Sequence, residues 1–478
     1  MTISLTLFTL ALYSPVDPAA YPEIDKPGAG SLADRYREPA QRIITAALAD
    51  NDAYRKLEEL CIRIGHRLSG SPQLEKAIDW AVDTMKKDGQ ENVRREKVMV
   101  PHWVRGKESV TLIEPRNEPL VMLGLGGSIG TPSEGITAQV VVVSGKDELE
   151  KIGDQAKGKI VLFNNIMPPY DPEKGSGYGA AVQYRGKGAS LASKQGAVAC
   201  LIRSVTAKSL RSPHTGAMRY GENDTKIPAA ALSTEDADTI ARLQAHGIPV
   251  VVNIKMEAQT LPDVSSANVV GELRGSTNPD EVVVIGGHID SWDVGHGAHD
   301  DGGGCVMAIE AINVLRKLKM IPRRTIRVVL FTNEENGLAG GKAYAADHTA
   351  ELAKHVAAIE TDSGVFRPTG YSAECENKER ETLAAEQLRD LVTLLSSIGP
   401  MKTNVGHSGA DISAMKPAGV LLMGHNVEGS TYFDYHHTHA DTIDKIDPEA
   451  LSQNVAALAT MAYIIADMPT RLGERPNP

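Results

Sequence analysis

Five short runs of the sequence combine histidine with aspartate or glutamate, or pair two acids, close to stretches of apolar residues. Imidazole nitrogens and carboxylate oxygens together are ligands that suit Zn²⁺. The chemistry suggested is therefore that of a metal centre. The residues concerned are His288 and Asp290 in GGHID, Asp300 and Asp301 in HDDGGG, Glu334 and Glu335 in FTNEEN, Glu360 and Asp362 in ETDSG, and His436, His437, His439 and Asp441 in DYHHTHADT.

Each of these runs by itself is only weak support for a metal site. A pair such as Glu334 and Glu335 at the end of a strand is more often a solvated turn, because acidic side chains favour exposed positions. A single histidine is more often structural than a ligand. The joint occurrence of all five runs at one predicted sheet edge is what favours a metal site.

The elements that must position these residues alternate between strands and helices. Residues 281–286 (EVVVIG) are continuously apolar, as expected for a strand covered on both faces. Further strands are predicted at 325–331, 356–359 and 420–423, and helices at 302–318, 340–355 and from Asp447 onwards. This alternation predicts an α/β fold with a doubly wound, mainly parallel sheet. Ligands of such sheets bind beyond the carboxyl ends of the strands, where the polar runs lie.

The chain is too long for one ordinary domain, at 478 residues. Helical patterns dominate its early part, and short β-branched runs between glycine and proline turns then suggest a small β-rich insert. The predicted organisation is a signal-like or disordered segment at 1–34, the first part of the main domain at 35–126, the insert at 127–261, the rest of the main domain at 262–470 and a tail at 471–478.

Composition excludes several classes of protein. Apolar residues make up 42% of the chain, so it can bury a core and is not mainly disordered. A net charge of −11 and an aromatic content of 4% disfavour a nucleic-acid partner. The four cysteines show no CxxC spacing, so we expect free buried thiols. The apolar run at 1–14 resembles a signal peptide without its basic start, which predicts a secreted or periplasmic protein with no stable membrane anchor.

The polar runs, together with CIRIGHRLSGSP at 61–72 and GADIS at 409–413, resemble the motifs of the co-catalytic dizinc exopeptidases related to bacterial leucyl aminopeptidases. The similarity extends over residues 35–468. It implies the zinc exopeptidase fold, and it suggests that the insert is a protease-associated domain. It also implies two Zn²⁺ ions per chain, peptide substrates and a possible homodimer.

The resemblance implies a ligand set. It makes Asp300 the carboxylate that bridges the two Zn²⁺ ions. His288 and Asp362 would complete one site, and Glu335 and His437 would complete the other.

The same resemblance implies two catalytic roles. Glu334 would be the general base that takes a proton from a water bridging the metals and returns it to the leaving amine. Asp290 would accept a hydrogen bond from the imidazole of His288 and orient it. In relatives the peptide bond between Asp300 and Asp301 is cis.

Several neighbouring residues stay ambiguous. His436 and His437 should point in opposite directions if the chain is extended there, so one of them alone can be a ligand, and His437 has the spacing of the family. Open interpretations concern His439 as a pocket residue, Glu360 as a rival of Asp362, His299 as a structural or rim residue, Asp411 as a support of the site, and Trp292 as a pocket or core residue.

The main functional hypothesis is an exopeptidase that hydrolyses dipeptides or short peptides. An aminopeptidase on the same metal core is an alternative, because the zinc motifs do not determine which terminus is held. A catalytically inactive binding protein is a second alternative. It is disfavoured because the five implied ligands and Glu334 are all present.

Overall fold

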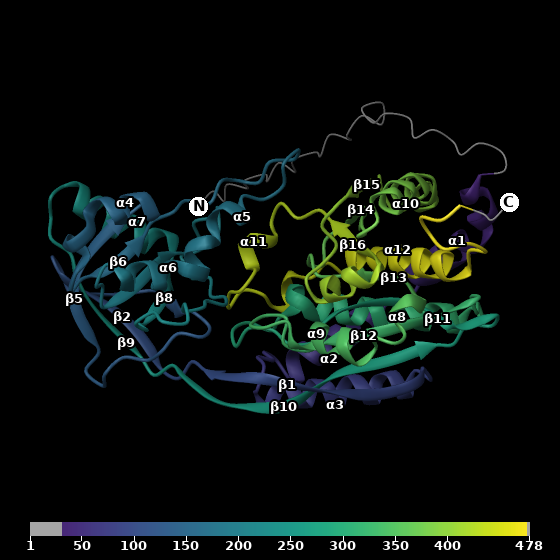
Figure 1. Ribbon diagram of the computed structural model, residues 1–478, viewed down its shortest axis with the longest axis horizontal. Helices are drawn as coiled ribbons and strands as arrows, with labels where there is room; N and C mark the ends of the chain where they lie inside the picture. The colour runs from purple at the N-terminus through teal and green to yellow at the C-terminus, as the bar shows by residue number, and fades with distance from the viewer. Residues whose placement is uncertain (1–30, 476–478) are drawn as a thin grey trace, which may run out of the picture.

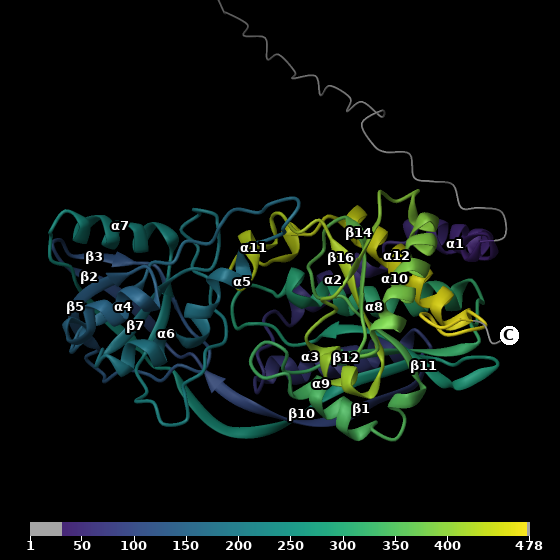
Figure 2. The same ribbon diagram turned by 45° about the horizontal axis from the view of Figure 1, so that its top comes forward.

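The computed structural model describes residues 31–475, which form two lobes that lie side by side (Figures 1 and 2). Residues 105–258 make up the smaller one, called the second lobe below, and the remaining residues form the first lobe. Most of the signal-like segment expected at 1–34 lies outside the described residues. Along the part of the chain that the structure describes, no helix has the length and apolar character needed to cross a membrane.

The first lobe is built on a sheet of eight strands. In order across the sheet these are β1 (Glu91–Val104), β10 (Gln259–Leu273), β12 (Arg324–Phe331), β11 (Asn278–His288), β13 (His355–Glu360), β16 (Leu421–Val427), β14 (Pro368–Glu374) and β15 (Lys402–Val405). The four central strands, β12, β11, β13 and β16, are parallel to one another, whereas β10 and β14 join them antiparallel on either side. The prediction of a mainly parallel α/β sheet is confirmed.

Helices cover both faces of this sheet. The helices of the first lobe are α1 (Leu32–Leu48), α2 (Asp52–Arg63), α3 (Pro72–Lys87), α8 (Gly303–Lys317), α9 (Ala339–Asp347), α10 (Lys378–Leu391), α11 (Tyr432–Tyr435) and α12 (Pro448–Asp467). The large core lies between the sheet and α1, α2, α3, α8 and α12, and a smaller one lies under α9 on the other face. As its sequence predicts, α12 starts with Asp447 as N-cap and Pro448 in the first turn.

The second lobe has an eight-stranded sheet of its own. Its strands, in order, are β3 (Glu118–Leu120), β2 (Glu108–Glu114), β9 (Val251–Met256), β5 (Ile136–Val143), β6 (Ile160–Phe163), β7 (Ala199–Arg203), β8 (Ala229–Leu232) and β4 (Met122–Gly124). Its helices are α4 (Lys146–Ile152), α5 (Tyr178–Ala181), α6 (Gln183–Lys194) and α7 (Thr234–Ala245). Because β2, β3 and β4 belong to this sheet, the second lobe begins about 20 residues before the start expected at 127.

Two long strands connect the lobes. β1 leads into the second lobe and β10 returns from it, and the two pair antiparallel along most of their length (Figure 1). The boundary between the lobes cannot be recognised from the sequence, because β2 follows β1 after a short turn and has the same alternating pattern. The four cysteines are buried and free, as predicted.

Candidate active site

The polar runs meet at the carboxyl edge of the central parallel strands. His288 ends β11 and lies opposite Phe331, the last residue of β12, after which the chain turns to Glu334 and Glu335. β13 runs alongside β11 and leads to Asp362. Parallel strands present their carboxyl ends on one side of a sheet, so register alone brings these side chains together.

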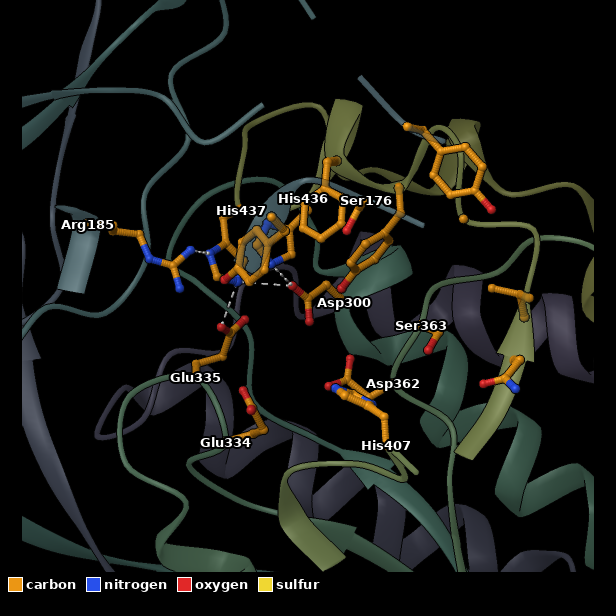
Figure 3. A pocket seen from close by; sticks show the side chains of 17 residues that line it. Ser176, Arg185, Asp300, Glu334, Glu335, Asp362, Ser363, His407, His436 and His437 are labelled. Carbon is orange, nitrogen blue, oxygen red and sulfur yellow. Dashed lines mark hydrogen bonds and ion pairs between the residues drawn. The ribbon is translucent and has the colours of Figure 1, made fainter. Parts of the chain in front are cut away.

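His288 and His437 both face Asp300 at this edge, and Figure 3 shows His437 beside Asp300 and Glu335. His288 Nε2 lies 3.1 Å from Asp300 Oδ1 and 3.6 Å from Asp362 Oδ1. His437 Nε2 lies 3.2 Å from Asp300 Oδ2 and 3.0 Å from Glu335 Oε2. The structure thus brings all five predicted ligands together in two groups, and each oxygen of Asp300 faces one group.

The donor set fits metal ions. His288 Nε2 and Asp300 Oδ2 are buried yet make no hydrogen bond, which is costly unless another partner satisfies them. The other ring nitrogens have backbone acceptors, Asp290 O at 3.0 Å from His288 Nδ1 and Thr215 O at 3.2 Å from His437 Nδ1. Because a carbonyl only accepts, both Nδ1 atoms carry a proton, and both Nε2 atoms are the ring nitrogens turned toward the carboxylates, where a bound metal ion would replace their proton.

The electrostatics of the site also favour a cation. Burial alone would lower the pKa of His437, but the charges of Glu335 and Asp300 raise this pKa to about 9. Burial and the neighbouring charge of Asp300 raise the pKa of Glu335 to about 7. Several carboxylates crowded in a buried site are stabilised by positive charge, which bound divalent ions would supply.

Glu334 is close to these groups but placed differently. It lines a cavity between the two lobes, and the ion pairs that His288 and His437 make among the described residues do not include it. Burial, together with the charges of Asp362 and Glu335, raises the pKa of Glu334 well above its ordinary value against the opposing charge of His288. A raised pKa suits a carboxylate that must take up a proton during a reaction.

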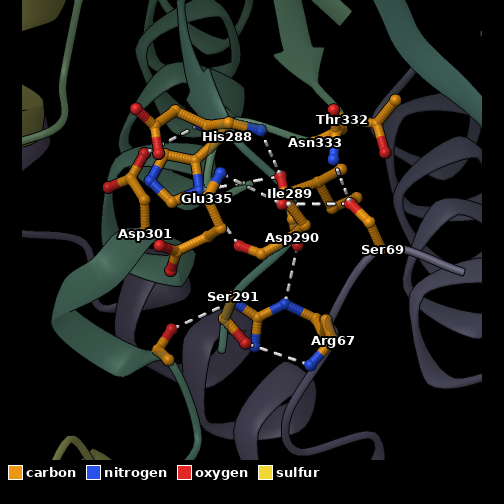
Figure 4. Close-up of polar contacts among 12 residues, drawn as sticks. Arg67, Ser69, His288, Ile289, Asp290, Ser291, Asp301, Thr332, Asn333 and Glu335 are labelled. Carbon is orange, nitrogen blue, oxygen red and sulfur yellow. Dashed lines mark hydrogen bonds and ion pairs between the residues drawn. The ribbon is translucent and has the colours of Figure 1, made fainter. Parts of the chain in front are cut away.

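Asp290 acts in a different way from the one predicted. Its backbone carbonyl, not its carboxylate, accepts the hydrogen bond from His288, and the carboxylate oxygen Oδ1 lies 3.8 Å from that ring nitrogen. The carboxylate accepts instead from the backbone N–H groups of Glu334 at 3.1 Å and Glu335 at 3.4 Å (Figure 4). The chain bends at Ile289, directly after β11, which places the Asp290 carbonyl within hydrogen-bond distance of the ring.

A buried arginine fixes the loop that follows. Arg67, from the motif at 61–72, donates to the backbone carbonyls of Ile289, Gly65, His296 and Gly297 at 2.6–3.0 Å, and Figure 4 shows it beside Ile289. Three of these carbonyls belong to the segment between His288 and Asp300, so one guanidinium holds that segment in one conformation.

The expectation that His436 and His437 point in opposite directions is wrong. Their rings stack with centroids 3.5 Å apart, because α11 ends there and His437 takes a left-handed conformation with φ of 61°. Both rings therefore face Asp300, but His436 Nε2 is 3.8 Å from Asp300 Oδ2 whereas His437 Nε2 is 3.2 Å away. The peptide bond between Asp300 and Asp301 is cis.

The contacts of the other ambiguous residues show where each of them lies relative to the site. Glu360 accepts from the backbone N–H groups of residues 410–412 and is no rival of Asp362. His299 is stacked on two aromatic rings and accepts a hydrogen bond from the backbone N–H of Val365, so it is structural.

Trp292 is buried against His437, and His439 is exposed and does not line the cavity. Asp411 is buried beside the site, with neither carboxylate oxygen hydrogen-bonded.

The second lobe contributes residues that the sequence did not reveal. A cavity of about 540 Å³ lies between the lobes and is lined by Tyr170, Ser176, Tyr178 and Arg185 opposite the metal-site residues. Thr215 pairs with His437 in both directions, since Thr215 N also donates to His437 O at 3.0 Å. No local pattern around these residues signals a site, because their partners lie more than 200 positions away.

Comparison with known proteins places the chain in a family. Residues 268–462 match peptidase family M28. Carboxypeptidase Q from Mus musculus is 41% identical over 440 residues, which cover 91% of this chain and 91% of the mouse protein. The chain belongs to peptidase family M28. The resemblance of its motifs to the zinc exopeptidases is thereby confirmed, with carboxypeptidase Q among the similar proteins, and so is the prediction of a metallo-exopeptidase.

Other M28 members agree in sequence and in fold. Carboxypeptidase Q from Homo sapiens is 41% identical and covers 91% of this chain and 90% of its own. The crystal structure of a peptidase M28 precursor from Shewanella amazonensis superimposes with a TM-score of 0.87 at 38% identity, covering 93% of this chain and 99% of that one. An aminopeptidase from Aneurinibacillus shares the fold, with a TM-score of 0.62 at 23% identity.

Proposed function

We propose that this M28 peptidase binds two Zn²⁺ ions and hydrolyses dipeptides or short peptides as an exopeptidase of the carboxypeptidase Q type. The observation that carries the proposal is the position of Asp300, whose two carboxylate oxygens face two separate groups of ligands. Two metal ions a few ångströms apart require a bridging anion of this kind.

Different residues of the chain have different roles in hydrolysis. His288 and Asp362 would hold one Zn²⁺, Glu335 and His437 the other, and Asp300 both. Zinc, when bound, supplies Lewis-acid polarisation of the scissile carbonyl and lowers the pKa of water. Glu334 takes the proton from the attacking water and passes it to the nitrogen of the leaving group. The carboxylate of Asp290 keeps the backbone of Glu334 and Glu335 in place for these roles.

Metal analysis of the purified protein after exhaustive dialysis tests the proposal. We expect two equivalents of zinc per chain. Replacement Asp300→Ala should remove both, because the bridge serves both sites, whereas Asp362→Ala should remove one. A fully active metal-free protein would contradict the proposal.

Blocked dipeptides separate the proposed activity from the aminopeptidase alternative. Acetylation of the N-terminus abolishes cleavage by an aminopeptidase, and amidation of the C-terminus abolishes cleavage by a carboxypeptidase. A dipeptidase requires both termini free. We expect amidation to lower kcat/KM about 100-fold here.

Export and dimerisation belong to the same proposal. The signal-like run at 1–14 supports a secreted or periplasmic location, which N-terminal sequencing of the mature protein would test. A homodimer is proposed from the family resemblance, and light scattering of the purified protein would measure it. The identity of the second lobe as a protease-associated domain stays a prediction.

A further inference from the structure

We propose that Arg185 binds the free α-carboxylate of the substrate's C-terminal residue and so sets the polarity of cleavage. This inference rests on the proposed exopeptidase function and adds the group that recognises the terminus. Arg185 lies in the first turn of α6 in the second lobe and reaches the cavity beside His437 (Figure 3).

The guanidinium of Arg185 is held in place before any substrate arrives. It packs on the backbone of Gly216, where a Cβ atom would come within 2.6 Å of Cζ. Its Cζ also lies 5.4 Å from the centre of the Tyr178 ring. A flat charged group fixed by its neighbours loses little conformational entropy when it binds an anion.

The charge of Arg185 has no anionic partner in the protein. Among residues 31–475 no carboxylate lies within ion-pair distance of it, and its buried Nε makes no hydrogen bond. Its Nη1 lies 3.4 Å from His437 Nδ1, but the proton on that nitrogen faces Thr215 O. Two N–H groups cannot satisfy each other, so the guanidinium retains donors for a ligand.

A terminal carboxylate is the substrate group that matches this position. Arg185 is the sole lysine or arginine among the residues that line the cavity, whose other ionisable groups are carboxylates, histidines and tyrosines. A guanidinium forms two parallel hydrogen bonds with a carboxylate and repels an ammonium group. In a peptide, the C-terminal carboxylate carbon of the last residue is three bonds from the carbonyl carbon under attack, roughly 3–4 Å. The position next to the metal ligand His437 is therefore within reach of that carboxylate.

Paired substrates test this role. The dipeptide Ala-Leu and its C-terminal amide would be compared with the wild-type zinc enzyme, with Arg185→Met, and with Lys187→Met as a matched control on the exposed face of α6. For Arg185→Met we expect kcat/KM for the free acid to fall about 100-fold, while the value for the amide changes less than about threefold. Zinc content should be unchanged, and Lys187→Met should behave as wild type.

Equal losses for acid and amide would overturn the proposal, since Arg185 would then act through His437 or through folding. So would a wild-type enzyme that cleaves the amide as fast as the acid. Calorimetry with zinc-loaded Glu334→Gln, with and without Arg185→Met, measures binding of the same two ligands without turnover. If no peptide is cleaved but acid binding still depends on Arg185, the exopeptidase proposal fails, while the assignment of Arg185 as the group that binds the carboxylate stands. Acid binding that is independent of Arg185 overturns it.

Discussion

Glu334 and Glu335 are neighbours in the chain, yet their side chains face different partners. Glu335 Oε2 lies 3.0 Å from His437 Nε2, and its Oε1 accepts from the backbone of Trp292 at 3.2 Å. Glu334 is half-buried and turned toward the cavity. Side chains that alternate in direction along a turn allow one residue to hold a metal ion while the next moves a proton.

Replacement of each glutamate by glutamine should separate these roles. Glu334→Gln keeps its shape but cannot accept a proton, so both zinc ions should remain while kcat falls by about 10²–10⁴-fold. Glu335→Gln loses a charged ligand, so zinc affinity and activity should fall together. Metal content and steady-state kinetics of the two variants measure the difference. Zinc loss in Glu334→Gln with full zinc in Glu335→Gln would reverse the assignment.

At the scale of elements, a loop of the second lobe supports a ligand of the first. His214 Nδ1 donates to the backbone carbonyl of His436 at 2.7 Å, and the next residue, Thr215, pairs with His437. Burial lowers the pKa of His214 to about 3, so this ring is neutral and keeps its role across the physiological range. The proposed metal site is therefore in contact with both lobes.

Replacement His214→Phe keeps the ring volume but removes the donor. We expect zinc affinity to fall about tenfold, as is usual when groups that support a metal ligand are lost. Competition with a fluorescent chelator measures this affinity. His246→Phe, at an exposed histidine of the same lobe, is the control and should leave zinc affinity unchanged. Equal affinities for wild type and His214→Phe would show that the lobe contact does not support the site.

A second contact between elements predicts a pH dependence of stability. His348, at the end of α9, lies 3.1 Å from Glu96 of β1. The hydrogen bond to Glu96 raises the pKa of His348, although burial opposes it. Burial would raise the pKa of Glu96, but hydrogen bonds from His348 and Arg94 lower it overall.

The direction of each pKa shift determines the pH range in which the pair stabilises the fold. A raised histidine pKa stabilises the fold fully below about pH 6.5, and this contribution is lost as the pH rises through the folded-state value. A lowered glutamate pKa stabilises above about pH 4.3 and is lost as the pH falls through its folded-state value. Chemical denaturation should show His348→Gln less stable than wild type by about 1 kcal/mol at pH 6, with a smaller difference at pH 9. A difference that grows with pH would contradict this assignment.

At the scale of the whole molecule, the two lobes enclose the catalytic edge. Residues of both lobes line the cavity of about 540 Å³, a volume that suits a small ligand. We expect kcat/KM to be at least about tenfold lower for a decapeptide than for a dipeptide with the same terminal residues. Comparable values for the dipeptide and for a folded protein would show that the second lobe does not limit substrate length.

Much of the first lobe could be predicted because its signals are local. Apolar runs predicted β11, β12, β13 and β16, and the Asp447-Pro448 start of α12 followed from capping chemistry. A parallel sheet then brings His288, Asp362 and the Glu334–Glu335 pair to one edge without further information. The start of the second lobe was missed because strand periodicity does not tell which sheet a strand joins.

Local patterns in the sequence predict which residues stand at the strand ends, because strand and helix periods depend on near neighbours in the chain. Which atoms of these residues make the contacts in the site depends on the tertiary structure. In the folded chain the backbone carbonyl of Asp290 accepts the hydrogen bond from His288, and the rings of His436 and His437 lie on the same side. Both arrangements depend on the backbone torsions of the loops that carry these residues. The tertiary structure also brought Arg185 and Thr215 to His437, and His214 to His436, across more than 200 residues. Packing between the lobes determines these contacts, and no local sequence pattern predicts them.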